Sequence, residues 1–328
     1  MKLKLFLLLI CLLGLIFFSA SSVFSPNFIK PIEKQQFSIG WVGDMVPAGN
    51  ESFNINGLNY VKDLTQEPSF MMGNLEGTFA KEDRVSKCSY IPTKCHAFRS
   101  GTSFAYALKD AGFDFISLVN NHSYDYGDEG LSDTEEVLKS FGIPFISPTK
   151  PSTIVVVENK RIGILGVSST PPKSTITNYS FIKEEIEKLK EDSDIVILVF
   201  HGGSEGSDKT IVTGEYEYLG TENRGNVLLV AQTAIDAGAD IVLGSGPHVL
   251  RKVSYYKNKP IIFSAGNFFG GNERLTTSGN LGISAVFTLT EKNNSFVNNL
   301  TSILLTKSGI PYPDPTNKAF YLLESLAN

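Results

Sequence analysis

Three of the four histidines in this 328-residue chain stand directly after short apolar segments, beside carboxylate or amide residues. They are His122 in "NNHSYD", His201 in "HGGSEG" and His248 in "SGPH". Two acidic residues, Asp44 in "GDMV" and Glu76 in "NLEG", follow further apolar segments. Imidazole, carboxylate and amide groups together suit Mn, Fe, Zn or Mg, and no thiolate suggests a closed structural zinc site. Asn267 likewise follows the apolar segment 260–266. Each residue alone could be an ordinary turn residue, but six such loops together favour a metal site.

Short β-branched or aromatic segments are expected to be the strands that carry these loops. They occupy residues 37–43, 113–119, 143–147, 153–158, 161–167, 194–200, 240–244, 260–266, 281–289 and 299–305. Segments with helical spacing occupy residues 102–111, 128–141, 180–191 and 222–237. The turn "ENK" joins two strands as a hairpin, so the sheet is not purely parallel. We predict an α/β fold with mixed β-sheets flanked by helices, in which ligands bind beyond the carboxyl ends of strands.

Composition limits the class of protein. The net charge is −5, and Lys and Arg are scattered rather than gathered in a basic stripe, so nothing indicates a nucleic-acid partner. Hydrophobic residues make up 42% of the chain, which is enough for a large core. We expect the main domain to cover residues 37–310, preceded by a linker (25–36) and followed by a C-terminal extension with a helix (311–328).

The N-terminal 24 residues predict export. Lys2 and Lys4 precede an uncharged, largely apolar run that fits a signal peptide cleaved after Ala20. The run is also long enough to cross a bilayer once as an uncleaved anchor. Either way, the basic start places the rest of the chain outside the cytoplasm, secreted or anchored to the cell membrane.

Two cysteines, Cys88 and Cys95, remain outside the export segment. Exported thiols seldom stay free, so a disulfide that closes the loop "CSYIPTKC" is the favoured interpretation. The alternative is a metal site that includes His96, although six intervening residues are poor zinc spacing.

Several longer motifs resemble the CapA-type capsule-synthesis family, which is linked to poly-γ-glutamate production and is similar to calcineurin-like metallophosphoesterases. The motifs are "GDMV", "NLEG", "AGFDFISLVNNHSYDYGDEGLSDT", "HGGSEG", "ENRGNV", "DAGADIVLGSGPHVLR" and "IIFSAGNF". The resemblance runs from about residue 37 to about residue 290 and implies a metallophosphoesterase-like sandwich.

The resemblance also implies roles for individual residues and a cofactor of one or two Mn, Fe or Zn ions. His122 would donate a proton to the leaving oxygen, and Asp125 would orient it. Glu76 would bridge two ions. The implied metal ligands are Asp44, Glu76, Asn121, His201 and His248. Residues expected to contact substrate are Asn74, Glu205, Arg251 and Asn267.

Three positions depart from the phosphoesterase pattern: Val46, Ser245 and Gly246 stand where that pattern has histidines. Fewer nitrogen ligands imply weaker or single metal occupancy. Two functions therefore stay open. One is a metal-dependent hydrolase that acts on a phosphoester or an acidic polymer. The other is a non-catalytic accessory subunit that binds an anionic polymer and assists a membrane-bound polymer synthase in its synthesis or export.

The fate of residues 5–24 can be tested directly. An uncleaved anchor should keep the protein in membranes after a carbonate wash, with its native N-terminus intact. Soluble protein whose N-terminus lies near Ser21 would instead establish a cleaved signal peptide.

Overall fold

A computed structural model of the chain describes residues 36–47, 56–90, 95–169, 176–270, 276, 278–293 and 295–327. The predicted signal peptide or anchor lies outside these residues, as does nearly all of the linker, so both stay predictions. No helix in the described part of the chain is long and apolar enough to cross a membrane. Residues 36–328 group as one unit.

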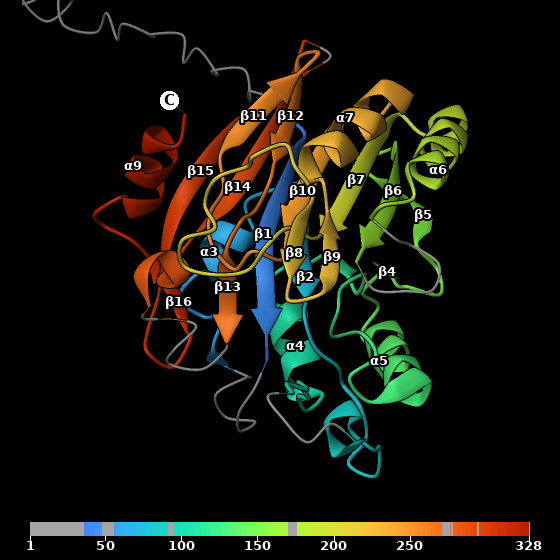
Figure 1. Ribbon diagram of the computed structural model, residues 1–328, viewed down its shortest axis with the longest axis vertical. Coiled ribbons are helices and arrows are strands. Elements are labelled where there is room, and N and C mark those ends of the chain that lie inside the picture. Colours follow the sequence, from blue (N-terminus) through green and yellow to red (C-terminus); the bar gives the residue numbers. More distant parts are fainter. Residues whose placement is uncertain are drawn as a thin grey trace, which may run out of the picture. The chain divides into compact units, whose positions relative to one another are not determined.

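Two mixed β-sheets form the centre of this unit (Figure 1). In the first sheet the strand order is β16-β15-β14-β1-β2-β3-β4, and β13 also pairs with β1. Strands β1 to β4 and β13 run parallel, whereas β14, β15 and β16 pair antiparallel. The bounds are β1 (Ser38–Val46), β2 (Phe70–Leu75), β3 (Phe115–Ser117), β4 (Phe145–Ile146), β13 (Asn267–Gly270), β14 (Ile283–Lys292), β15 (Ser295–Leu305) and β16 (Pro311–Pro313).

The second sheet has the order β11-β12-β10-β7-β6-β5, with antiparallel strands at both edges and parallel strands between them. A separate hairpin pairs β8 with β9. The bounds are β5 (Ser152–Val157), β6 (Lys160–Ser168), β7 (Ile195–His201), β8 (Glu217–Leu219), β9 (Glu222–Gly225), β10 (Ile241–Ser245), β11 (Val253–Tyr256) and β12 (Lys259–Ile262).

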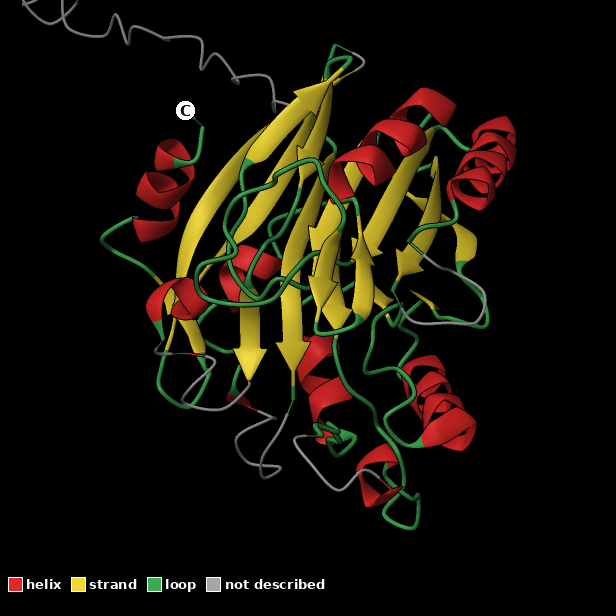
Figure 2. Ribbon diagram, viewed as in Figure 1, coloured by secondary structure: helices red, strands yellow, loops and turns green. Residues whose placement is uncertain are grey.

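Helices cover the outer faces of both sheets (Figure 2). One apolar cluster packs α4 and α5 against the first sheet, and another packs α6 and α7 against the second. The helices are α3 (Lys62–Thr65), α4 (Ser103–Asp110), α5 (Gly127–Ser140), α6 (Tyr179–Asp192), α7 (Val227–Ala237) and α9 (Lys318–Ser325). The arrangement confirms the predicted α/β class with mixed sheets flanked by helices.

The alternation of side chains along β7 shows how the layers are built. Ile195, Ile197 and Val199 enter the cluster between the two sheets, whereas Leu198 and Phe200 enter the cluster beneath α6 and α7. Successive side chains of a strand point to opposite faces, and both faces here are covered. A strand of this kind must be apolar throughout, which is why "IVILVF" reads as a continuous hydrophobic run.

One predicted helix boundary differs from the structure. The helix expected at residues 222–237 begins only at Val227, because the Asn226 side chain accepts a hydrogen bond from the Leu229 N–H and caps the helix there. Residues Glu222–Gly225 instead form β9. The C-terminal extension contains the expected helix, α9, which packs on β14 and β15, and β16 at its start pairs with β15.

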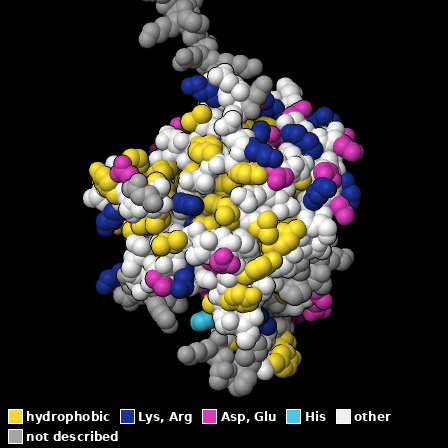
Figure 3. Space-filling view, turned by 45° about the horizontal axis from the view of Figure 1, so that its top comes forward, with side chains coloured by type: hydrophobic (Ala, Val, Ile, Leu, Met, Phe, Trp, Pro, Cys, Tyr) yellow, Lys and Arg dark blue, Asp and Glu magenta, His cyan; other side chains and the backbone are white. Residues whose placement is uncertain are grey.

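The surface carries both signs of charge. On the face shown in Figure 3, Lys and Arg side chains are interspersed with Asp and Glu rather than gathered in one field.

Trp41 links the two sheets, and its loss should measurably weaken the fold. Its buried indole Nε1–H, on β1, donates to the Gly244 carbonyl oxygen on β10 at 3.3 Å. Trp41→Phe removes this bond and leaves unfilled volume, so we expect a loss of about 1–3 kcal/mol in the free energy of unfolding. Urea unfolding followed by far-UV circular dichroism measures it. Tyr60→Phe, at an aromatic residue that is 68% exposed, is the control. A shift no larger than that of the control would contradict the expectation.

Candidate metal centre

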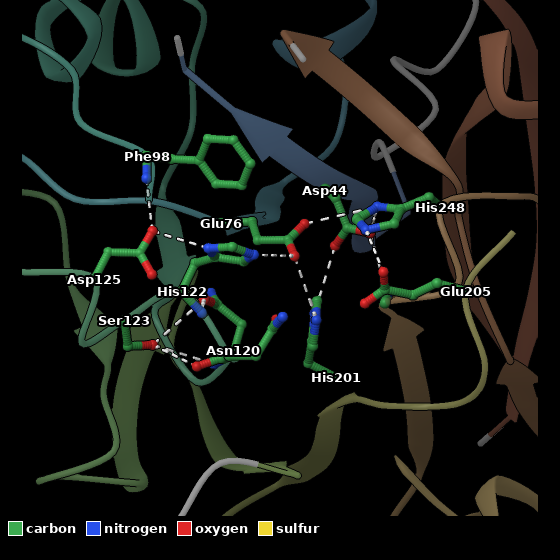
Figure 4. A network of polar contacts seen from close by, with 12 residues as sticks. Asp44, Glu76, Phe98, Asn120, His122, Ser123, Asp125, His201, Glu205 and His248 are labelled. Carbon is green, nitrogen blue, oxygen red and sulfur yellow. Dashed lines mark hydrogen bonds and ion pairs between the residues drawn. The ribbon is translucent and has the colours of Figure 1, made fainter. Parts of the chain in front are cut away.

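Parallel strands from both sheets bring one acidic or histidine residue each to a common point (Figure 4). Asp44 lies near the end of β1 and Glu76 directly follows β2, both in the first sheet. His201 ends β7 and His248 follows β10, both in the second sheet. Each side chain is at least nine-tenths buried. The carboxyl ends of parallel strands therefore meet here, as the sequence predicted.

The ligand atoms of Asp44, Glu76 and His201 all lie within 4.8 Å of one another. His201 places Nδ1 3.6 Å from Asp44 Oδ1 and Nε2 3.5 Å from Glu76 Oε1. His248 Nδ1 lies 3.2 Å from Asp44 Oδ2 and 3.7 Å from Glu76 Oε2. Four of the five predicted metal ligands thus converge, with both carboxylates between the two imidazoles.

The Asp44 carboxylate is held ionised by its surroundings. Asn74 Nδ2 donates to Oδ1 at 2.8 Å, and the Gly246 N–H donates to Oδ2 at 3.1 Å. Burial opposes ionisation, but hydrogen bonding and charge from His201 and His248 outweigh it and hold the pKa of Asp44 well below its usual range.

Glu76 has the opposite environment. Both carboxylate oxygens are buried and have no hydrogen-bond donor among the described residues. Burial therefore raises the pKa of Glu76 well above its ordinary value. Buried oxygens without a partner are costly, so they indicate a partner of another kind. A divalent cation suits them, and the donor set of carboxylate oxygen and imidazole nitrogen is one that Mn, Fe or Zn accepts.

Asn121, the fifth predicted ligand, resembles Glu76 in having a buried side-chain oxygen without a partner. Its side-chain Oδ1 is also buried and has no hydrogen-bond donor in the described part of the chain. Its neighbour Asn120 is instead engaged within the protein, because its Nδ2 donates to Asn74 Oδ1 and to the Leu75 carbonyl oxygen. The Asn120 Oδ1 also accepts a hydrogen bond from the His122 N–H, so of the two adjacent asparagines only Asn121 has a side-chain oxygen without a donor among the described residues.

The two imidazoles of the group differ in charge. Burial lowers the pKa of His201, which favours the neutral ring that a metal requires. Burial acts on His248 in the same direction, but the carboxylates of Glu76 and Asp44 outweigh it and raise the pKa of His248 to about 10. A bound divalent ion would replace the His248 proton, because metal ligands bind in their deprotonated form. His248 also adopts a positive φ of 62°, which is uncommon for a residue with a side chain.

His122 stands beside the group rather than within it. Its Nδ1 lies 2.8 Å from Asp125 Oδ2, and its Nε2 points toward Glu76 Oε1 at 3.8 Å (Figure 4). Burial lowers the pKa of His122, and Asp125 opposes this shift. Asp125 is held in turn by Lys87 Nζ at 2.5 Å and by the Phe98 N–H at 2.6 Å. The predicted pairing of His122 with Asp125 is present.

Lys87 and Phe98 flank the loop closed by the Cys88–Cys95 disulfide, whose Cα atoms are 5.4 Å apart. The disulfide prediction is confirmed, and the alternative metal site at these cysteines is not formed. The Phe98 ring lies 4.5 Å from the His122 ring, centroid to centroid. Neither Lys87 nor Phe98 was predicted as a site residue, although each lies within three residues of one of the two cysteines.

A cleft of about 430 Å³ opens onto the group, and it is lined in part by Val46, Phe98, His122, Glu205 and His248. Among the four residues expected to contact substrate, Glu205 lines this cleft. The other three are buried and occupied by protein partners, so we revise their role from substrate contact to positioning. Asn74 holds Asp44, Asn267 Oδ1 lies 2.9 Å from His248 Nδ1, and Arg251 pairs with Glu217.

The structure shows what surrounds the three positions that depart from the phosphoesterase pattern, Val46, Ser245 and Gly246. Val46 contributes an apolar wall to the cleft. The Ser245 hydroxyl lies 3.1 Å from His201 Nδ1 and so contacts a ligand instead of supplying one. Gly246 has φ +114°, and a Cβ there would lie 2.9 Å from the Gly202 nitrogen. The position thus requires glycine and uses its N–H on Asp44.

Arg224 is a site residue that the sequence analysis missed. Its guanidinium is fully buried, and its NH2 nitrogen lies 3.4 Å from His201 Nε2 and 3.1 Å from Glu205 Oε1. The quoted motif "ENRGNV" contains this residue, but nothing in its spacing indicated that β9 returns to the ends of β7 and β10.

The sequence profile of the bacterial capsule synthesis protein family PGA_cap matches residues 39–272. The chain belongs to this family. It is 26% identical over 291 residues to the capsule biosynthesis protein CapA of Bacillus anthracis, covering 78% of this chain and 66% of that protein. It is 27% identical over 221 residues to the PGA biosynthesis protein CapA of Bacillus subtilis, covering 64% and 55%. The chain therefore spans about two thirds or less of the length of these relatives.

Among solved structures, a purple acid phosphatase from yellow lupin (Lupinus luteus) aligns over 84% of this chain and 53% of that chain, with a TM-score of 0.40 and 12% identity. Family membership confirms the resemblance drawn from the motifs, and the site geometry stands on this chain's own residues.

The converging donors predict that the purified protein contains a divalent transition metal. His201→Ala combined with His248→Ala removes the two imidazoles of the group, so bound metal should fall severalfold. His96→Ala removes a cleft histidine outside the group and should leave the metal content unchanged. Elemental analysis of the three proteins measures this. Equal, near-zero metal in all three would contradict it.

Proposed function

We propose that this chain is a metal-dependent hydrolase of the capsule synthesis family that acts outside the cytoplasm on an anionic substrate. One observation carries the proposal. The Glu76 carboxylate has no hydrogen-bond partner among the described residues, and its oxygens lie 3.5 Å from His201 Nε2, 3.7 Å from His248 Nδ1 and 3.8 Å from His122 Nε2. His122 and His248 also line the adjoining cleft. Metal-binding groups and a proton-transfer group thus face the same place.

The metal group would consist of Asp44, Glu76, Asn121, His201 and His248. A divalent ion bound there supplies Lewis-acid polarisation of an oxyanion and lowers the pKa of a water molecule. Asp44 is ionised and fixed by Asn74 and Gly246, so it needs no rearrangement to bind a cation.

Proton transfer would fall to His122. Asp125 accepts the Nδ1–H, which fixes the tautomer and leaves Nε2 free to exchange a proton on the Glu76 side. Burial keeps the pKa of His122 low in the protein alone, but an anionic substrate would favour the protonated ring. His122 can then give a proton to the leaving oxygen, while the Phe98 ring covers its face.

The substrate class rests on chemistry and on the family. A metal ion held by this group, together with the imidazoles that line the cleft, would suit a phosphoester or the carboxylates of an acidic polymer such as poly-γ-glutamate. The relatives' names refer to capsule and PGA biosynthesis, which favours a role beside a membrane-bound polymer synthase. Export is supported by the basic, apolar N-terminus and by the disulfide.

The second candidate is a non-catalytic accessory subunit that binds the polymer. The observation that favours it is the reduced number of nitrogen ligands, with Val46 at the cleft wall and Ser245 against His201. A site of this kind could bind carboxylates through a metal ion without turning them over.

His122→Asn separates the two candidates. A hydrolase should lose about 100–10,000-fold in turnover while it keeps its metal, because His122 lies outside the ligand group. Hydrolysis of a chromogenic phosphoester, alongside metal analysis, measures both quantities. Asp44→Asn is the matched comparison and should lose metal and activity together. If folded, metal-bound His122→Asn protein supports normal polymer production in cells, the hydrolase proposal fails and the binding subunit stands.

A further inference from the structure

Planar rings line the side of the cleft on which His122 lies. The His122 and Phe98 rings are 4.5 Å apart, centroid to centroid. The Phe98 and His96 rings are 6.3 Å apart, and their planes are inclined by 13°. All three residues line the cleft, where His122 is buried, Phe98 is half-buried and His96 is exposed. Rings therefore accompany this side of the cleft from the proposed proton donor outward to solvent.

The position of these rings decides which part of a substrate they would touch. Figure 4 shows the Phe98 ring beside His122, whereas His248 and Glu205 lie on the other side of Glu76. The group that takes a proton from His122 is the leaving oxygen, so the remainder of the leaving group must lie near His122 and Phe98. The rings would thus contact the leaving group rather than the phosphoryl group.

The cleft has the size and the lining of a small-molecule site. Its volume is about 430 Å³, and small-molecule pockets commonly measure about 300–1,000 Å³. The aliphatic side chains of Val46, Leu219 and Leu281 add to the apolar part of its wall, and Leu219 is 39% exposed. Apolar walls beside a few polar groups suit a compact ligand that has an apolar part and an anionic end.

The charged groups of the wall do not favour a run of carboxylates. The described residues that line the cleft include the carboxylates of Glu205 and Asp208 and no Lys or Arg. Glu205 pairs with the fully buried Arg224, and its other oxygen lies 3.8 Å from His248 Nε2. Asp208 pairs with Lys209, which is not among the described lining residues. A polymer with a carboxylate on each unit would meet like charges here, which reduce affinity.

We propose that the substrate is a small phosphoester whose leaving group carries a planar aromatic ring, and that His96 and Phe98 select this ring by stacking. This inference rests on the proposed hydrolase function and names the substrate class of its site. Hydrolysis consumes one water molecule, whose oxygen joins phosphorus as the P–O bond to the leaving group breaks. The leaving oxygen takes the His122 proton, and the proton that the water loses restores His122. The products are a ring-bearing alcohol or phenol and a phosphate with one ester bond fewer.

The binding of three phosphonates to the full-length protein loaded with Mn²⁺ tests this, because the P–C bond of a phosphonate takes the place of the ester bond that would be cleaved. Phenylphosphonate has a planar ring, cyclohexylphosphonate has a puckered ring of similar size, and methylphosphonate has none. Isothermal titration calorimetry gives each Kd. Wild type should bind phenylphosphonate about 2–10-fold more tightly than cyclohexylphosphonate, the advantage typical of an aromatic contact beyond its buried area. Methylphosphonate should bind most weakly.

His96→Leu and Phe98→Leu each replace a ring by an aliphatic side chain. Each should bring the ratio of the two Kd values toward one and leave the Kd of methylphosphonate unchanged, because neither side chain belongs to the metal group. Phe98→Tyr keeps a ring and should keep the ratio. Tyr90→Leu is the matched control, because this ring is 80% exposed and outside the described lining of the cleft, and its ratio should equal that of wild type.

Each other result has a definite meaning. Equal Kd values for phenylphosphonate and cyclohexylphosphonate in wild type overturn the inference and leave the metal-dependent function standing. A preference that survives both leucine substitutions also overturns it, because the ring is then recognised elsewhere. Tighter binding of a γ-glutamyl oligomer than of phenylphosphonate overturns the substrate class in favour of the acidic polymer. Manganese-loaded wild type that binds none of the phosphonates contradicts the proposed hydrolase itself. If Phe98→Leu does not fold, wild type and His96→Leu still decide.

Discussion

The structure depends on one buried carboxylate, that of Asp44, which ties the two sheets together at the end where function resides. An ionised carboxylate in the interior costs several kcal/mol unless it is compensated. Compensation comes from both sheets at once, through Asn74 on β2 and through the Gly246 N–H and His248 after β10. Three features help to place donors around this carboxylate. They are the glycine at position 246, the positive φ of His248 and the close approach of β1 to β10.

A second arrangement, independent of the first, orients His122, the proposed proton donor. His122 takes its direction from Asp125, and Asp125 is gripped by Lys87 and by the Phe98 N–H. Those two residues stand on either side of the Cys88–Cys95 disulfide, so a short covalent loop keeps both partners of Asp125 in place. The oxidising compartment expected from the N-terminus and the orientation of His122 are therefore physically connected.

Family membership links the chain to capsule synthesis, whereas the geometry of the site indicates which chemistry its residues could carry out. The bacterial capsule synthesis profile covers residues 39–272, which include every residue of the metal group and the His122–Asp125 pair. The candidate ligand set contains fewer nitrogen atoms than the phosphoesterase pattern, because Val46 and Ser245 supply no imidazole. Arg224, from the β8–β9 hairpin, places a buried guanidinium against Glu205 and His201 at the edge of the group.

By itself the sequence determined the class of fold and most of the metal group. Buried parallel strands must be apolar throughout, so their ends are visible as the points where polar residues begin, and Asp44, Glu76, His122, His201 and His248 all stand at such points. Tertiary structure alone decided the roles of residues whose partners are distant in sequence. Asn74, Asn267 and Arg251 looked like substrate contacts but are buried against protein groups, and Arg224 gave no sign because β9 was taken for the start of a helix. The physical reason is that a strand end marks where a side chain emerges from the sheet. Burial and the choice of partner depend instead on packing between elements that can be more than 200 residues apart, as in the hydrogen bond from Gly246 to Asp44, whose separation is 202 residues.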